Sequence, residues 1–385
     1  MNPTLGEGYR YDVLGRVDEA KHGKFALPNT IRTLSYDPAS ELVGYADNAY
    51  TYTTQVDSSC TRSLAGDPCP DTSLVQNITP GPSGSYTYDS VGNRKDPAAP
   101  TGGLDVANRL RRSQYLRMDY DAAGELIVKR ALKASDTTQV LRRDSLFWSA
   151  IGRLDSVHTR DSLGALTRVG FGYDGWGHRV RKSTASGTSR YLWDRDALVM
   201  ELDTLGSRVA EYTYYPGTDN PESVRRHDRG DTTYYYLSDE SRNVVGLLKR
   251  TATGIVIANA YSYEPFGALQ SSTESAPNSL RFAGREYDSE TGLYYFRARY
   301  YDPAVGRFVS EDPIGLGGGI NQYAYASNDP VNGSDPTGLC HRPNAAGTGA
   351  DFGVCISSER ARWDWRQSGV PVLGWVLQAR ITLDF

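Results

Sequence analysis

The stretch YRYDVLGRV, from Tyr9 to Val17, returns along the chain in related forms and decides its fold. Its Asp opens a type I turn by accepting backbone hydrogen bonds, and the Gly three residues later supplies a positive φ. The flanking residues alternate, so tyrosines two positions apart point to the same face of a strand. Each copy therefore predicts a β-hairpin with tyrosines along one side.

Several copies follow one another at intervals of about 25 to 28 residues. They are YTYDSVGNR (Tyr86 to Arg94), DYDAAGELI (Asp119 to Ile127), GYDGWGHRV (Gly172 to Val180) and the degenerate SYDPASELV (Ser35 to Val43), LDVANRL (Leu104 to Leu110) and WSAIGRL (Trp148 to Leu154). The expected turn positions are Gly15, Ser40, Gly92, Asn108, Gly124, Gly152 and Gly177. Because a single hairpin is not stable alone, the repeats predict stacked hairpins that bury a continuous face.

The composition favours an all-β chain. Among 385 residues Tyr accounts for 27 and Gly for 39, and both favour strands joined by tight turns. The net charge of −4 gives no general reason to expect nucleic acid or an anionic membrane as a partner. No stretch approaches the roughly 20 apolar residues of a membrane span. The start, MNPTLGEGYRYD, lacks the layout of a signal peptide.

The cysteines form two local pairs, Cys60 with Cys69 and Cys340 with Cys355. Neither pair has the CxxC spacing of a zinc or redox site, so local disulfides and free thiols both stay open. The five histidines are never clustered, which argues against a histidine-based metal site. We expect neither a metal nor a cofactor.

The tyrosine pairs allow two interpretations. They could form a platform for sugars or bases, or they could pack across strands with their hydroxyls reaching solvent or backbone. We favour the packing. Further along, QSSTESAPNS (Gln270 to Ser279) is small, polar and rich in turn residues, which predicts a linker or exposed loop.

Two pentapeptides, DPIGL at Asp312 and DPTGL at Asp335, are nearly identical. Asp-Pro pairs initiate turns, and the residues alone favour that interpretation. Alternatively, two aspartates in matching local frames could face each other and share a proton. One would then act as base on a water while the other, protonated, polarises a carbonyl.

The YDxxGR units resemble the YD or Rhs repeats of bacterial polymorphic toxins, insecticidal toxin-complex C components and teneurins. Residues 280–339 resemble the Rhs-associated core almost from end to end. The resemblance implies a strip of hairpins that coils into a partial or complete hollow shell. It also implies a core that cuts the chain after the second DPxGL, between Leu339 and Cys340.

Within that core, the family pattern places an arginine upstream of the pentapeptides, and Arg299 matches it. We therefore expect Asp312, Asp335 and Arg299 to form a single-turnover aspartyl self-cleavage site, with the acid and base unassigned. Arg297 is the second choice for the arginine. An alternative nucleophile is Cys340, as in an intein-like domain, although the 46 residues that follow the cut are short for one.

The resemblance also implies an organisation and a function. The expected domains are repeats at 1–269, a linker at 270–279, the core at 280–339 and a variable tail at 340–385. The tail would be cargo released in toxin delivery or contact-dependent competition between bacteria. Expected partners are secretion-apparatus or upstream shell components and, if the tail is toxic, an immunity protein. Nucleic acid is not expected as a partner. The chain would be secreted or surface-exposed by a specialised route after a cytoplasmic stage.

Two other functions stay open. The chain could be a cell-surface adhesion or carbohydrate-binding repeat protein whose core is purely structural. It could also be an inactive, displaced C-terminal cassette. Encapsulation would need more hairpins than about ten, so the chain could be a fragment of a longer protein.

Overall fold

The computed structural model is built from antiparallel strands, as the repeats predict. It describes residues 8–12, 14, 16–22, 30–56, 72–95, 103–339 and 342–343. The four cysteines, the Gly15 turn and almost all of the expected tail lie outside these residues. Within the described residues, no helix is long and apolar enough to cross a membrane.

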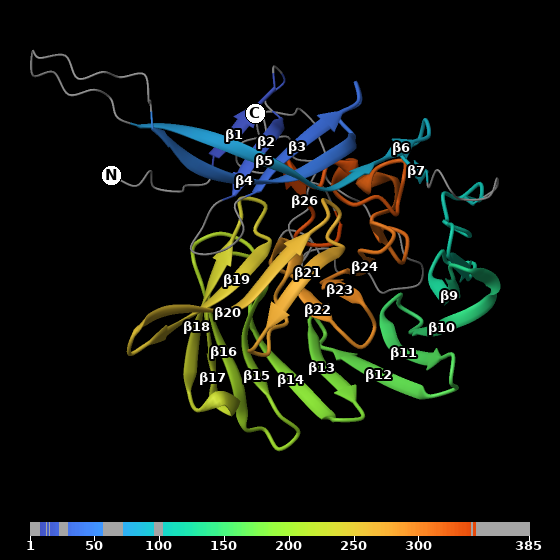
Figure 1. Cartoon of the computed structure of the whole chain (residues 1–385). Helices are drawn as coiled ribbons and strands as arrows, with labels where there is room; N and C mark the ends of the chain where they lie inside the picture. The colour runs from blue at the N-terminus through green and yellow to red at the C-terminus, as the bar shows by residue number, and fades with distance from the viewer. Residues whose placement is uncertain are drawn as a thin grey trace, which may run out of the picture.

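One sheet of fourteen strands dominates the molecule, and each strand pairs with the next along the chain. Its strands are β8 (Leu116–Tyr120), β9 (Leu126–Lys133), β10 (Asp136–Trp148), β11 (Leu154–Asp161), β12 (Leu166–Tyr173), β13 (Arg179–Thr184), β14 (Gly187–Asp194), β15 (Ala197–Leu202), β16 (Arg208–Tyr214), β17 (Pro221–Arg226), β18 (Thr232–Ser238), β19 (Val244–Thr251), β20 (Gly254–Tyr263) and β21 (Leu269–Glu274). The sheet is curved but open, with β8 and β21 as its edges (Figure 1). Of the two shell forms expected, the described part of the chain is therefore the partial one.

A second sheet of five strands covers one end of the curved sheet (Figure 1). It contains β1 (Gly8–Tyr11), β2 (Val17–His22), β3 (Thr30–Tyr36), β4 (Leu42–Val56) and β5 (Thr72–Ser85), and a short pair, β6 (Thr87–Tyr88) and β7 (Arg94–Lys95), follows it.

The concave side of the large sheet holds the C-terminal core (Figure 1). Its elements are η2 (Phe282–Gly284), β22 (Glu286–Asp288), β23 (Leu293–Phe296), β24 (Arg299–Asp302), β25 (Arg307–Phe308), η3 (Gly315–Gly318), η4 (Ala326–Asn328), β26 (Gly333–Ser334) and β27 (Arg342–Pro343), while η1 (His227–Arg229) joins β17 to β18. The expected linker at 270–279 differs from the structure, because its first five residues lie in β21. The polar residues of this stretch fit an edge strand, whose side chains are mostly exposed.

The repeat turns form where the sequence predicts them. Ser40 and Asn108 adopt positive φ of 65° and 62°, as do the glycines at the other expected positions within the described residues. In each turn the amide of this residue donates to the carbonyl of the residue three positions earlier. The same turn recurs at four further positions, Gly164, Gly206, Arg242 and Gly267.

The tyrosines of the repeats face the core. Tyr212, Tyr236 and Tyr263 are all buried. Several repeat tyrosines donate their hydroxyl to a backbone carbonyl of an earlier strand; these bonds are Tyr36 to Val17, Tyr88 to Leu42, Tyr173 to Leu154, Tyr214 to Leu198 and Tyr263 to Val244. The favoured packing role of these tyrosines is thus observed, and their rings offer no exposed platform for a sugar.

Candidate active site

The structure brings Arg299, Asp312 and Asp335 together, although 36 residues separate the first from the last. Arg299 lies on β24, and the two aspartates open the turns on either side of the η3–η4 segment. Nη2 of Arg299 is 2.9 Å from Oδ2 of Asp312 and 3.1 Å from Oδ2 of Asp335. A single guanidinium nitrogen therefore joins the two carboxylates.

All three side chains are buried. Arg299 is 3% exposed, Asp312 6% and Asp335 2%. The guanidinium also donates through Nη1 to the carbonyl of Gln322 at 2.8 Å. Its Cζ lies 3.6 Å from the centre of the Phe308 ring, an arrangement that favours a cation over an aromatic face. These contacts fix the guanidinium from several sides.

Burial shifts the ionisation of the site. It raises the pKa of Asp312 to about 6, against the opposing effects of Arg299 and of the Ile314 amide. Burial also lowers the pKa of Arg299, against the pull of both carboxylates. Of two adjacent carboxyl groups, one is disposed to hold a proton, and Asp312 has the raised pKa that this requires.

Both pentapeptides form the turn of the repeats. The Gly315 amide donates to the Asp312 carbonyl at 2.8 Å, and the Gly338 amide donates to the Asp335 carbonyl at 3.3 Å. Gly338 has a φ of 70°, and a Cβ there would lie 2.3 Å from the carbonyl oxygen of Phe296. The turn interpretation and the paired-carboxylate interpretation are thus compatible. The backbone of each aspartate forms the turn, while its side chain contacts Arg299.

The residue four positions after each aspartate differs between the repeats and the pentapeptides. In five of the repeats its side chain contacts the second carboxylate oxygen of the turn aspartate; these pairs are Asp12 with Arg16, Asp89 with Asn93, Asp105 with Arg109, Asp174 with His178 and Asp239 with Asn243. In the pentapeptides that position is Leu316 or Leu339. Because leucine offers no polar group, Oδ2 of each aspartate turns to Arg299 instead.

The backbone before the expected cut is held at the same place. The Leu339 amide donates to Oδ1 of Asp335 at 3.0 Å, and Nε of Arg299 donates to the Gly338 carbonyl at 2.5 Å. Cys340 lies outside the described residues. The chain therefore reaches Leu339 while still in contact with two of the three site residues.

A small cavity of about 20 Å³ lies next to Asp335, which is room for about one water molecule. Its polar lining includes Thr218, Asp219 and Ser241. Neither Arg299 nor Asp312 lines it. Of the two aspartates, Asp335 is thus the one beside the water-sized space.

Arg297, the second choice, has different partners. Its Nη1 and Nη2 contact Asp219 at 3.0 and 2.6 Å, and it also bonds to the Pro336 carbonyl. Arg285 contacts Asp219 as well, at 2.8 Å. The two arginines hold the pKa of the buried Asp219 carboxyl below its usual range, despite the opposing effect of its burial. Through Arg297, Asp219 thus connects the loop after β16 with the turn that contains Asp335. Nothing in the repeat pattern of the sequence predicts this connection.

Three asparagines between the pentapeptides, which we call the asparagine clasp, attach the site to the N-terminal repeats. They are Asn321, Asn328 and Asn332. Asn321 and Asn328 both donate to the Gly92 carbonyl, at 2.9 and 2.7 Å, and Asn328 also donates to Glu41 at 2.8 Å. Asn332 accepts from the Val17 amide at 2.9 Å. Turns from the first 95 residues thus hold the segment that joins the two aspartates.

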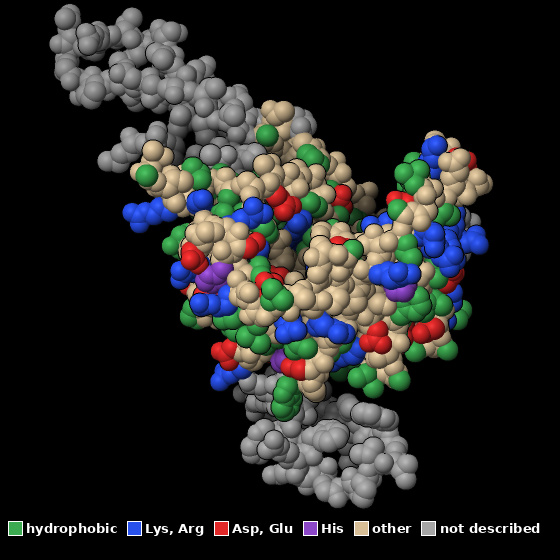
Figure 2. Space-filling model, turned by 90° about the horizontal axis from the view of Figure 1, so that it is seen from below, with side chains coloured by type: hydrophobic (Ala, Val, Ile, Leu, Met, Phe, Trp, Pro, Cys, Tyr) green, Lys and Arg blue, Asp and Glu red, His purple; other side chains and the backbone are tan. Residues whose placement is uncertain are grey.

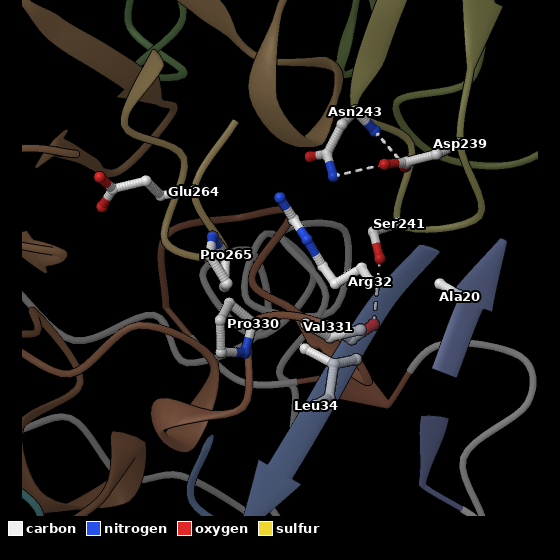
Figure 3. A pocket seen from close by; sticks show the side chains of 10 residues that line it. All are labelled: Ala20, Arg32, Leu34, Asp239, Ser241, Asn243, Glu264, Pro265, Pro330 and Val331. Carbon is white, nitrogen blue, oxygen red and sulfur yellow. Dashed lines mark hydrogen bonds between the residues drawn. The ribbon is translucent and has the colours of Figure 1, made fainter. Parts of the chain in front are cut away.

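A second cavity, of about 40 Å³, lies between the N-terminal sheet and the core (Figure 3). Arg32 reaches into it, and its guanidinium is held by Asp47 at 2.6 and 2.7 Å and by the Tyr263 carbonyl. None of the three site residues lines this cavity.

Comparison with known proteins identifies the family. The teneurin YD-shell family matches residues 70–331. Double-stranded DNA deaminase toxin A of Burkholderia cenocepacia is 33% identical over 288 residues, which are 66% of this chain and 19% of that protein. Toxin protein Tse5 of Pseudomonas aeruginosa is 60% identical over 60 residues, 16% of this chain and 5% of its own.

Among solved structures, the crystal structure of TcdB2-TccC3-Cdc42 matches with a TM-score of 0.48 and 18% identity, over 86% of this chain and 17% of that one. The chain spans less than a fifth of the length of each of these three proteins. Repeats, turns and family match agree, and the chain belongs to the teneurin YD-shell family as an Rhs/YD-repeat protein of the polymorphic-toxin type.

Proposed function

We propose that this chain is the self-cleaving C-terminal part of a bacterial Rhs toxin and that it cuts its own Leu339–Cys340 bond. The observation that carries the proposal is the contact of Arg299 with both Asp312 and Asp335, at the point where it also holds the Gly338 carbonyl. A buried pair of carboxyl groups beside a fixed backbone is the arrangement that aspartyl hydrolysis requires.

In the proposed reaction, Asp335 is the base and Asp312 the acid. Asp335 takes a proton from a water in the adjacent cavity, and the water oxygen adds to the Leu339 carbonyl carbon. Asp312, whose pKa is raised to about 6, donates its proton toward the carbonyl oxygen. When the C–N bond breaks, Asp335 passes the proton that it took from water to the nitrogen of Cys340. Asp312 recovers its proton from the former carbonyl oxygen, and Leu339 keeps the new carboxyl group.

Arg299 has a positioning and electrostatic role in this scheme. Its positive charge stabilises the ionised carboxylate of Asp335, which burial would otherwise disfavour. Its bond to the Gly338 carbonyl sets the register of the backbone, so that the next carbonyl is the one attacked. Preorganised groups of this kind need no rearrangement during the reaction.

The product beginning at Cys340 would be the effector, and the repeats and core would be its carrier. The relatives named above are toxins, which supports export and delivery to another cell. A secretion apparatus, upstream shell partners and an immunity protein are the partners that this function implies.

The test is an intact-mass spectrum of the freshly purified chain under denaturing conditions. Self-cleavage yields one species that ends at Leu339 and another that starts at Cys340. Asp312→Asn, Asp335→Asn and Arg299→Ala should each leave the chain whole. Cys340→Ala should still be cut, because the mechanism needs no thiol.

Asp302→Asn is a matched control. Asp302 is another buried core aspartate followed by proline, but its carboxylate contacts Lys129 rather than Arg299 or the asparagine clasp. This variant should be cut like the parent chain. If a folded Asp335→Asn chain were cut at the same bond, the proposed site would be wrong.

A further inference from the structure

A row of arginines crosses the convex face of the large sheet. Arg117, Arg130, Arg143 and Arg160 lie directly opposite one another on four successive strands, β8 to β11. Arg112 pairs with Arg117 in an isolated bridge and extends the row by one position. Residues directly opposite in an antiparallel sheet share a face, so all five side chains project on the same side.

The row continues diagonally over the next three strands. Arg168 lies opposite His158, and Arg181 lies opposite Arg190. Their strand neighbours Val169 and Tyr191 are buried against the core, so the arginines point away from it. We call the eight residues the arginine band; they are Arg112, Arg117, Arg130, Arg143, Arg160, Arg168, Arg181 and Arg190.

Few carboxylates lie close to the arginines of the band. Within the described residues, Arg130 is its one member with a carboxylate within 4.0 Å, Asp119 at 2.7 Å. Arg143, Arg160, Arg168, Arg181 and Arg190 are all exposed. Figure 2 shows Lys and Arg side chains gathered on the side of the molecule where β9–β11 lie, at the right of the view. This occurs in a chain whose net charge is −4.

Like charges directly opposite on neighbouring strands destabilise a sheet. A soluble strip of hairpins has no structural need for five of them in succession. Outside the band, exposed Arg208, Arg225 and Arg229 each lie within 4.0 Å of a carboxylate, whereas exposed Arg195 and Arg250 have no carboxylate of the described residues that close. Most of the exposed arginines without a nearby carboxylate among the described residues therefore belong to the band.

An aromatic pair borders the band. Phe147 is 47% exposed, and its ring centre lies 4.6 Å from that of His158. His158 lies opposite Arg168 on the same face. Phe147 thus offers an exposed aromatic ring next to the row of positive charges.

We propose that the arginine band binds a linear phosphodiester chain, with single-stranded nucleic acid as its occupant. Neighbouring strands lie about 4.8 Å apart, so the band extends about 30 Å across seven strands. Guanidinium groups in a line match successive phosphates. An exposed ring beside such a line is the second requirement of single-strand binding, because bases stack on it.

A lipid surface fits the band less well. The sheet is convex (Figure 1), so a flat membrane would touch few of the arginines at once, whereas a flexible chain can follow the curve. Stacking on Phe147 would also add nothing to binding by lipid headgroups. The two partners therefore differ in how they respond to Phe147.

The test is fluorescence anisotropy of a labelled 20-residue oligothymidylate with the full chain, between 50 and 200 mM NaCl. Each phosphate neutralised in a single strand contributes about −0.7 to the slope of log K against log salt. The triple variant Arg130→Ala, Arg143→Ala and Arg160→Ala should bind at least about tenfold more weakly, with a slope about 2 units shallower. Phe147→Ala should weaken binding by about fivefold with little change in slope.

The control is the triple variant Arg208→Ala, Arg225→Ala and Arg229→Ala, which removes the same charge elsewhere and should bind like the parent. The thermal midpoint of the band variant should be no lower than that of the parent, because it loses like-charge contacts. No binding at 50 mM NaCl, or equal losses in the two triple variants, would overturn the proposal. So would band-dependent binding to phosphatidylglycerol vesicles in the absence of oligonucleotide binding, which would assign the band to lipid.

Discussion

At the residue scale, the candidate site is a repeat turn with one side chain changed. Asp12 and Asp105 give their second oxygen to an arginine four residues later. Asp312 and Asp335 have leucine at that position and give theirs to Arg299. The local ion pair of those repeats is thus replaced at Asp312 and Asp335 by one shared with Arg299 over a long sequence separation. The replacement requires both the loss of the local polar group and the position of Arg299 between the two turns.

Restoring that polar group should impair self-cleavage. Leu316 is 74% exposed, so Leu316→Arg can be accommodated, and its guanidinium would compete with Arg299 for Oδ2 of Asp312. We expect the uncut fraction to rise severalfold, as measured by intact mass after a fixed time. Leu316→Ala is the control and should be cut normally. Equal cleavage of both variants would contradict the idea that the introduced arginine competes with Arg299 for Asp312.

The raised pKa of Asp312 predicts how self-cleavage depends on pH. As the acid, Asp312 must be protonated, and its pKa of about 6 means that the protonated fraction falls as pH rises above 6. The rate should therefore decline by about tenfold per pH unit above that point.

To measure this, uncut chain recovered from inclusion bodies in urea is diluted into buffers from pH 4.5 to 8.5. Tryptophan fluorescence follows folding in the same samples, so that slow folding is not mistaken for slow cleavage. A rate that increased above pH 6 would assign the acid role to another group.

At the element scale, the hairpins are joined by side chains as well as by their ladders. Tyr173 and Tyr263 each donate their hydroxyl to a carbonyl 19 residues earlier. Trp148 and Trp193 donate their indole nitrogen to carbonyls 22 and 14 residues earlier. These bonds lie on the buried side, where an unsatisfied carbonyl is costly. The ring thus fills the core while its polar end closes the turn.

Removing one such hydroxyl should therefore measurably destabilise the sheet. Tyr263→Phe keeps the ring but takes the donor from the Val244 carbonyl, at a cost of about 1 to 3 kcal/mol. Tyr235→Phe, at a tyrosine that is 48% exposed, is the control. Urea denaturation followed by circular dichroism should place the midpoint of the first variant lower than that of the second.

Local chemistry made the hairpins predictable from the sequence. A turn that needs positive φ accepts few residue types, so Gly124 and Asn108 could be placed with confidence and proved to have it. The turns at Gly164, Gly206 and Arg242 have the same backbone bond but lack the flanking YD signature, and they were missed. β21 was missed because none of its side chains is buried, so no alternation of apolar and polar residues marks it as a strand.

Part of the candidate site could also be predicted from local sequence motifs. The repeated pentapeptide marked Asp312 and Asp335, and the family pattern marked Arg299. Asp219 was not predictable, since its contact with Arg297 joins residues 78 positions apart and depends on how far the strip curves. The asparagine clasp was not predictable either, because its partners are backbone and side-chain groups more than 200 residues away in the sequence.

At the scale of the whole molecule, the clasp makes the two ends of the chain interdependent. Asn328 holds the Gly92 carbonyl and Glu41, while the aspartates on either side of it meet at Arg299. The distance between those aspartates thus depends on repeats that are made before them. Self-cleavage should require those repeats to be folded.

Two variants test that dependence. Asn328→Ala, which leaves Arg299, Asp312 and Asp335 in place, should slow self-cleavage severalfold. Deletion of residues 1–95 should have a larger effect, because it removes every N-terminal partner of the clasp. Both are followed by intact mass and by the thermal midpoint. If the shortened chain folded and were cut at the parent rate, the core would be self-sufficient.

The strand order of the large sheet has a mechanical consequence. Each strand from β8 to β21 forms its backbone ladders only with its neighbours in the sequence among the described strands, so a pulling force at the β8 edge loads one ladder at a time rather than all of them together. Such a sheet would unzip hairpin by hairpin at low force. The core, whose asparagines and arginines are tied to turns far apart in the chain, would yield last and in a single large step.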